Sequence, residues 1–170
     1  TAAAFLAYSR TTAEAAIIEV GLGGRLDATN VIGNPLVCGI AQLGIDHQAF
    51  LGDDAVTIAG EKAGIAKAGV PLVTMNYPKG ETLRIAEVAS NAGASCHPKG
   101  SDWDSAPYRG QLHYRDEIGK LSVPLPRLPG THQAMNAALA IAMLRHQSMV
   151  AVPERATRAA MGWADWPARL

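Results

Sequence analysis

Residues 15–30 read AAIIEVGLGGRLDATN, and this stretch decides the fold class of the chain. The apolar run at 15–18 ends at the carboxylate of Glu19, and a glycine-rich loop with polar side chains follows at once. A buried parallel strand delivers reactive groups to the carboxyl edge of its sheet in this way, and glycines let backbone approach a ligand closely. The pattern predicts a strand at 15–19 and a ligand-binding loop. A strand followed by a flexible surface loop is the alternative.

Composition narrows the class of protein further. The 170 residues suit one domain with a sizeable core. The 15 basic and 15 acidic residues balance, and no Lys/Arg cluster occurs, which argues against nucleic acid or an anionic membrane as partner. No apolar segment reaches the roughly 18 to 20 residues that span a bilayer. Cys38 and Cys96 lie in largely apolar surroundings, which is typical of reduced thiols in a cytoplasmic protein.

The rest of the chain alternates between strand and helix patterns. Strands are predicted at 36–42, 72–75 and 94–97, and helices at 2–9, 54–67 (with Asp53 as N-cap), 81–91 (closed by Gly93), 131–146 and 153–161. Residues 111–115 and 120–123 predict an antiparallel hairpin. The expected fold is α/β, with a mostly parallel sheet flanked by helices on both faces and a small antiparallel hairpin.

Two side chains are candidates for a metal site. Glu19 and His47 each follow a predicted strand, so they project from the same sheet edge if the two strands are parallel and close. A carboxylate and an imidazole suit manganese or zinc as readily as magnesium. His47 as an ordinary loop histidine after a turn at Asp46 is the alternative.

Lys62 is a candidate catalytic group. It lies in the segment EKAGIAK at 61–67, among small and apolar residues rather than on a charged face. A lysine that is partly desolvated and close to other cations loses basicity, and it can then react with carbon dioxide to form an anionic, metal-binding carbamate. Glu61 and Lys62 as ordinary solvated helix residues are the alternative.

Two further residues are candidates for nucleotide contacts. Asn136 lies one turn after His132 at the start of the predicted helix at 131–146, and its amide offers the paired donor and acceptor that match an adenine edge. Arg169, beside Trp166 and Pro167, could bind phosphate with its guanidinium fork. Asn136 could instead cap or solvate its helix.

Together these segments resemble the folylpolyglutamate synthase/dihydrofolate synthase family of the Mur ligase superfamily. The matching segments, in the family's order, are EVGLGGRLDATNV at 19–31, DHQAFLG at 46–52, IAGEKAGIAK at 58–67, LPGTHQAMNAALA at 128–140 and WPARL at 166–170. The resemblance implies ATP-dependent ligation of L-glutamate to dihydropteroate or folate. ATP phosphorylates the carboxylate, and the amine of glutamate attacks the acyl phosphate.

The resemblance also implies a role for each matching residue, and a cytoplasmic monomer that uses Mg²⁺ and ATP. The implied roles are Mg²⁺ ligation by Glu19 and His47, carbamylation of Lys62, contact of Leu26, Asp27 and Ala28 with dihydropteroate, contact of Asn136 with adenine, and contact of Arg169 with the ATP phosphates. Ala168 stands where family members usually have glycine.

The same family comparison implies that residues 1–170 are part of a larger ligase. No G-x-x-x-x-G-K-[ST] phosphate loop occurs in the chain, and GLGGRL at 21–26 fits neither that motif nor G-x-G-x-x-G. In the family the phosphate loop precedes the Glu19 segment, and a glutamate-binding domain follows the position of Leu170. We therefore expect a central ATP-binding domain without its phosphate-loop segment, inactive alone.

Two other functions are open alternatives. One is a peptidoglycan-type Mur ligase, against which the loop at 21–30 and EKAGIAK at 61–67 favour the folate branch. The other is a non-catalytic nucleotide-binding or scaffold protein.

Overall fold

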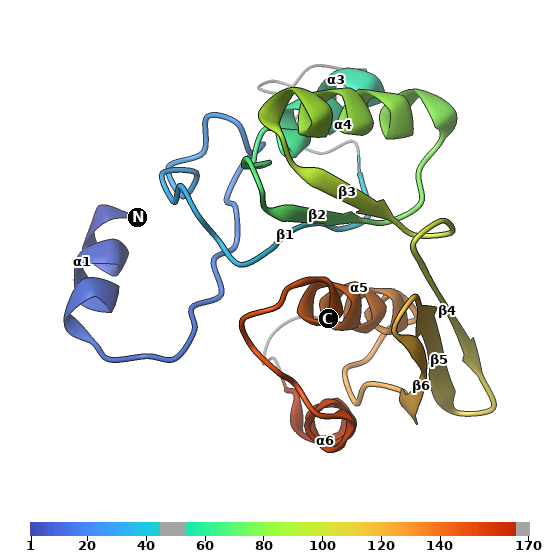
Figure 1. The fold of residues 1–170 in the computed structure, drawn as a ribbon. Coiled ribbons are helices and arrows are strands. Elements are labelled where there is room, and N and C mark those ends of the chain that lie inside the picture. The colour runs from blue at the N-terminus through green and yellow to red at the C-terminus, as the bar shows by residue number, and fades with distance from the viewer. Residues whose placement is uncertain (45–53, 166–170) are drawn as a thin grey trace.

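The computed structural model describes residues 1–44 and 54–165 (Figure 1). The elements of this part, in chain order, are α1 (Ala2–Arg10), β1 (Cys38–Ile40), α3 (Ala55–Ala63), β2 (Pro71–Thr74), α4 (Lys79–Ala92), β3 (Ser95–Pro98), β4 (Trp103–Tyr108), β5 (Gln111–Asp116), β6 (Gly119–Pro124), α5 (His132–His146) and α6 (Glu154–Trp163). None of these helices combines the length and apolar character that crossing a bilayer requires.

The first sheet is parallel, as the alternating pattern predicts. β2 lies between β1 and β3, with Leu72 opposite Cys38 on one side and Cys96 on the other. Its residues Leu72 and Val73 are fully buried because helices cover both faces. α3 and α4 lie on one side of the sheet, and α5 lies on the other (Figure 1). The prediction of a mixed α/β fold with a parallel sheet and flanking helices is confirmed.

The second sheet is antiparallel, with strand order β4-β5-β6. The predicted hairpin corresponds to β5 and β6, and Trp103 on β4 stacks on Tyr114 of β5 at a ring separation of 5.9 Å. β4 itself was not predicted from the sequence. Its polar Asp104 and its Pro107 weaken the strand pattern, and proline is tolerated here because β4 is an edge strand.

The predicted strand at 15–19 is wrong for the structure described. Residues 15–20 form no regular element, and the side chain of Ile17 is 95% exposed. An extended apolar segment becomes a strand only when another strand satisfies its backbone groups. No strand of the described part pairs with it, so the segment lies outside the sheet.

Several predicted boundaries also shift. The strand predicted at 36–42 is confined to Cys38–Ile40. α3 is capped by Asp54, whose Oδ2 accepts hydrogen bonds from the backbone N–H and hydroxyl of Thr57, each at 2.9 Å. The predicted cap, Asp53, lies outside the described residues. α3 ends at Ala63 rather than at 67, because turns follow from Gly64 onward. The closure of α4 by Gly93, in the left-handed conformation at φ 75°, is confirmed.

A buried carboxylate joins the second sheet to α5. The side chain of Asp116, at the end of β5, is 1% exposed and accepts two hydrogen bonds from Arg145 of α5, at 2.6 and 2.7 Å. It also accepts from the Tyr114 hydroxyl and from the backbone N–H groups of Ile118 and Gly119. One carboxylate therefore fixes both the β5–β6 turn and the docking of the hairpin on α5.

Asp116→Asn is expected to lower the free energy of unfolding by about 1.5–3 kcal/mol, the usual contribution of hydrogen bonds to charged groups. The reason is that Arg145 loses an ionised, bidentate partner in a buried position. Urea denaturation measures the change. The matched control is Glu154→Gln, which alters an exposed pair with Arg158 and is expected to cost at most about 1 kcal/mol. Equal losses in the two variants would contradict this assignment.

The same carboxylate predicts a dependence of stability on pH. Burial alone would raise the pKa of Asp116, but the hydrogen bonds and charge of Arg145, with help from Gly119 and Tyr114, lower it overall. A lowered folded-state pKa stabilises the fold fully above the unfolded value and loses this contribution as pH falls through the folded value. We expect stability to decline below about pH 4, and less steeply in Asp116→Asn. Urea titrations at a series of pH values test this, and identical slopes would refute it.

Candidate functional site

The glycine-rich loop at residues 21–30 is folded around the carboxylate of Asp27. Its Oδ2 accepts hydrogen bonds from the backbone N–H groups of Gly21 at 3.2 Å and Leu22 at 3.1 Å. Its Oδ1 accepts from the backbone N–H and the hydroxyl of Thr29. Hydrogen bonds from the Thr29 hydroxyl and N–H lower the pKa of Asp27 most; burial opposes them, and the N–H groups of Leu22 and Gly21 lower the pKa further. The carboxylate therefore holds the loop in shape in its ionised form.

The folded loop packs directly against the end of α3. The Arg25 N–H donates to the Glu61 carbonyl oxygen at 2.9 Å, and the Arg25 guanidinium pairs with the Glu61 carboxylate at 3.0 Å. A Cβ atom on Gly24 would lie 2.8 Å from the carbonyl oxygens of Glu61 and Lys62. A Cβ atom on Gly64 would lie 2.8 Å from the Arg25 Cα. Glycine is therefore required on both sides of this contact.

Two residues of the loop face outward from this contact. The side chain of Leu26 is 80% exposed, and Ala28 is exposed as well. Asp27 lies between them with its carboxylate directed into the loop's own hydrogen bonds. The loop therefore presents two apolar side chains next to the exposed guanidinium of Arg25. The predicted contact of these three residues with dihydropteroate stays a prediction.

Lys62 lies on the last turn of α3, on the same stretch of helix that contacts the loop. Its side chain is half-buried, and its ammonium forms no ion pair or hydrogen bond with any residue in the described ranges. The geometry brings Lys62 next to the loop, because the Lys62 carbonyl borders Gly24. Its carbamylation stays a prediction.

The predicted metal site is described only in part. Glu19 is exposed and directly precedes the loop, and its carboxylate is of the ligand type that Mg²⁺ or Mn²⁺ prefers, but its role as a metal ligand stays a prediction. His47 lies outside the described residues, as does Arg169. Among residues 1–44 and 54–165, no group of three or more His, Cys, Asp or Glu side chains gathers into a metal site.

The predicted adenine contact lies on another element. Asn136 is exposed on the second turn of α5, and its side-chain Nδ2 donates to Gln133 Oε1 at 3.2 Å. Thr131 occupies the N-cap position but forms no side-chain cap. α5 and α3 lie on opposite sides of the parallel sheet (Figure 1), so the structure does not bring Asn136 together with the loop that packs on α3.

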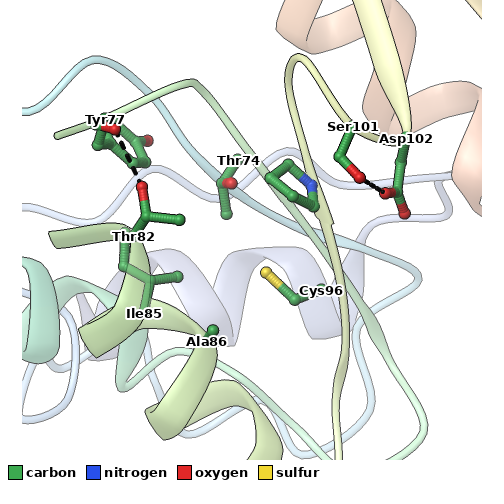
Figure 2. A pocket seen from close by; sticks show the side chains of 9 residues that line it. Thr74, Tyr77, Thr82, Ile85, Ala86, Cys96, Ser101 and Asp102 are labelled. Atoms are coloured by element: carbon green, nitrogen blue, oxygen red, sulfur yellow. Dashed lines mark hydrogen bonds between the residues drawn. The ribbon is translucent and has the colours of Figure 1, made fainter. Parts of the chain in front are cut away.

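A cavity of about 260 Å³ lies at the carboxyl ends of β2 and β3 (Figure 2). Its lining includes Thr74, Cys96, Ile85 and Asp102, and it contains none of the site residues predicted from the sequence. Burial, followed by the charge of Asp102, raises the pKa of the Cys96 thiol, which favours the unreactive protonated form. This cavity is therefore separate from the candidate site.

A row of three hydrogen-bonded polar side chains, which was not predicted from the sequence, lies beside a second cavity of about 450 Å³. His97 Nδ1 is 2.8 Å from Asp102 Oδ2, and His97 Nε2 is 3.2 Å from Ser95 Oγ, the bonding order of a Ser–His–Asp triad. The neighbouring N–H groups at 100–102 all donate to local carbonyls, so they form no oxyanion site. These hydrogen bonds thus link β3 to the turn that follows it. The i, i+2 spacing of Ser95 and His97 on one strand face was the available signal.

The site and fold define an α/β protein in which a glycine-rich loop, hydrogen-bonded around Asp27, packs on the end of helix α3. No protein-family model matches the chain. A folylpolyglutamate synthase of Arabidopsis thaliana is 38% identical over 156 residues, covering 89% of this chain and 25% of that protein. The structure of E. coli FolC in complex with DHPP and ADP matches with a TM-score of 0.77 and 36% identity, covering 88% of this chain and 34% of that one.

A third relative carries a metal. The bifunctional folylpolyglutamate synthase/dihydrofolate synthase of Yersinia pestis, complexed with AMPPNP and Mn ion, matches with a TM-score of 0.74 and 34% identity, covering 89% of this chain and 35% of that one. The chain belongs to the folylpolyglutamate synthase/dihydrofolate synthase family. It spans well under half of the length of these relatives.

Gly64→Ala is expected to lower the free energy of unfolding by about 1–3 kcal/mol, the usual cost of overpacking, because the new methyl group would overlap with Arg25. The φ of Gly64 is −61°, which alanine also adopts, so the effect isolates the steric contact. Thermal or urea unfolding measures it. The control is Gly33→Ala, where nothing lies within 4 Å of the added Cβ. A Gly64→Ala protein as stable as the control would show that the loop does not depend on this contact.

Proposed function

We propose that the chain forms the central ATP-binding domain of a ligase that adds L-glutamate to dihydropteroate and folates. The observation that carries the proposal is the docked loop, which presents Leu26 and Ala28 beside Lys62 on α3. Support comes from relatives whose structures contain DHPP with ADP, or AMPPNP with Mn ion. The phosphate-binding loop and the glutamate-binding domain would be supplied by sequence outside residues 1–170.

The proposed chemistry divides among the predicted residues. Glu19 and His47 would hold Mg²⁺, which neutralises charge on the transferring phosphoryl group. The carbamate of Lys62 would add an anion for metal binding. Leu26, Asp27 and Ala28 would form the pteroate contact, with apolar side chains and backbone meeting the ring system. Asn136 would contact the adenine, and Arg169 the ATP phosphates.

The proposal also covers the setting of the enzyme. Two unbridged cysteines fit a reducing compartment, so we place the ligase in the cytoplasm. We propose that it acts as a monomer on small-molecule substrates only.

The full-length protein is expected to form a glutamyl amide from dihydropteroate or folate, ATP, Mg²⁺ and L-glutamate, with release of ADP and phosphate. Chromatographic detection of the product measures this. The same assay with a UDP-muramoyl peptide as acceptor tests the peptidoglycan alternative. Activity only with the latter would overturn the folate assignment, and absence of ATP turnover with either acceptor would favour the scaffold alternative.

Glu19→Ala in the full-length protein is expected to lower kcat by about 100-fold or more, because loss of a metal ligand removes several kcal/mol of transition-state stabilisation. The matched control is Glu14→Ala, which removes an exposed carboxylate five residues earlier and is expected to leave kcat unchanged. Both variants are assayed over a range of Mg²⁺ concentrations. A Glu19→Ala enzyme with near wild-type kcat would remove Glu19 from the metal site.

A further inference from the structure

Asn30, at the end of the loop, uses its whole side-chain amide to join the loop to the segment after α3. Its Nδ2 donates to the Arg25 carbonyl oxygen at 3.0 Å and to the Gly64 carbonyl oxygen at 3.1 Å. Its Oδ1 accepts from Lys67 Nζ at 2.8 Å, and its backbone carbonyl oxygen accepts from the same ammonium at 3.3 Å. Both donors and the acceptor of the amide are thereby satisfied, which specifies asparagine here.

The segment that Asn30 binds is itself anchored to the parallel sheet. Between Gly64 and Lys67, the Ile65 carbonyl oxygen accepts a hydrogen bond from the Cys38 thiol on β1 at 3.4 Å, and Ala66 is buried in the core. Lys67 is half-buried, and Asn30 is the only hydrogen-bond partner of its ammonium among residues 1–44 and 54–165. The loop is therefore tied through Asn30 to a fixed part of the fold rather than to a mobile surface.

This arrangement lies between the predicted dihydropteroate contacts and the predicted catalytic lysine. Leu26–Ala28 lie within the ten residues that Asp27 and Asn30 organise, and Lys62 lies two residues before Gly64, where the segment bound by Asn30 begins. In a ligase the acceptor carboxylate and the transferring phosphoryl group must meet, and a displacement of about 1 Å can cost on the order of 100-fold in rate. A contact that fixes the loop relative to α3 therefore bears on the chemistry without touching substrate.

We propose that Asn30 and Lys67 are positioning residues that hold the acceptor-binding loop in register with Lys62. The inference rests on the proposed ligase function and names a part of its machinery that the motif comparison did not assign. Asn30 sets the loop's position through two carbonyl oxygens, and Lys67 orients the Asn30 amide so that both of its N–H groups point at them.

The test uses Asn30→Asp in the full-length enzyme. The substitution keeps the shape and the Lys67 partner, but it replaces two N–H donors with an oxygen that faces the carbonyls of Arg25 and Gly64. We expect kcat with folate or dihydropteroate to fall about 100-fold, with KM for ATP within about twofold, because Asn136, the predicted adenine contact, lies on α5 on the other side of the parallel sheet. The control, Asn34→Asp, adds the same charge at an exposed position four residues on and is expected to behave as wild type.

Lys67→Met provides a second route if Asn30→Asp does not fold. It keeps the aliphatic stem and removes the ammonium, and we expect kcat to fall about tenfold, less than in Asn30→Asp, because both N–H donors of Asn30 remain. In a double-mutant cycle, Asn30→Ala with Lys67→Met is expected to cost no more than Asn30→Ala alone, because the two residues act as one unit. In each variant we expect hydrogen exchange of the backbone amides at 20–31 to become faster. Exchange of the amides of β2, which serve as the internal control, is expected to stay unchanged.

The outcomes separate the two proposals. A wild-type enzyme that ligates, together with folded Asn30→Asp or Lys67→Met variants that keep wild-type kcat, overturns the positioning role alone. Additive losses in the cycle, or unchanged exchange at 20–31, overturn it as well. A wild-type enzyme that fails to ligate any folate acceptor overturns the proposed function instead.

Discussion

The close approach of two backbones, the loop at Gly24 and the end of α3, is the constraint on which the candidate site depends. Neither backbone can carry a side chain at the point of contact, because a Cβ atom on Gly24 or Gly64 would overlap with its neighbour. The contact explains why a loop rich in glycine is nonetheless held in one shape. The glycines remove bulk where the loop meets the helix, and Asp27 and Asn30 supply the hydrogen bonds that replace lost rigidity.

The parallel sheet provides the fixed frame for this contact, and its two cysteines belong to the frame rather than to the chemistry. Cys38 and Cys96 flank Leu72 on the two outer strands, which separates them by two strand spacings, about 9 to 10 Å. That distance is too large for a disulfide. Burial raises the pKa of both thiols, so they remain protonated. Cys38 instead donates to Ile65 and links the sheet to the segment that Asn30 holds.

The elements predicted correctly from the sequence are those that depend on residues close together in the chain. The β5–β6 hairpin and the closure of α4 at Gly93 follow from residues adjacent in the chain. The strand at 15–19 could not be judged this way, because an apolar run specifies burial but not the partner strand that would pair with it. β4 was not predicted because its sequence contains Pro107, which is unfavourable inside a sheet. The proline is tolerated because β4 is an edge strand, with a neighbouring strand on one side only.

The candidate site shows the same limit at the level of single side chains. The motif predicted that Leu26, Asp27 and Ala28 contact a substrate, but it did not indicate which way the carboxylate of Asp27 points. Asp27 looks like a substrate ligand in the sequence, yet its oxygens accept four hydrogen bonds from within the loop. A carboxylate committed in this way shapes the backbone that a ligand meets. The side chains that remain exposed beside this backbone are the apolar Leu26 and Ala28 and the charged Arg25, so the loop's own hydrogen bonds, rather than the residue types alone, decide which groups a ligand can meet.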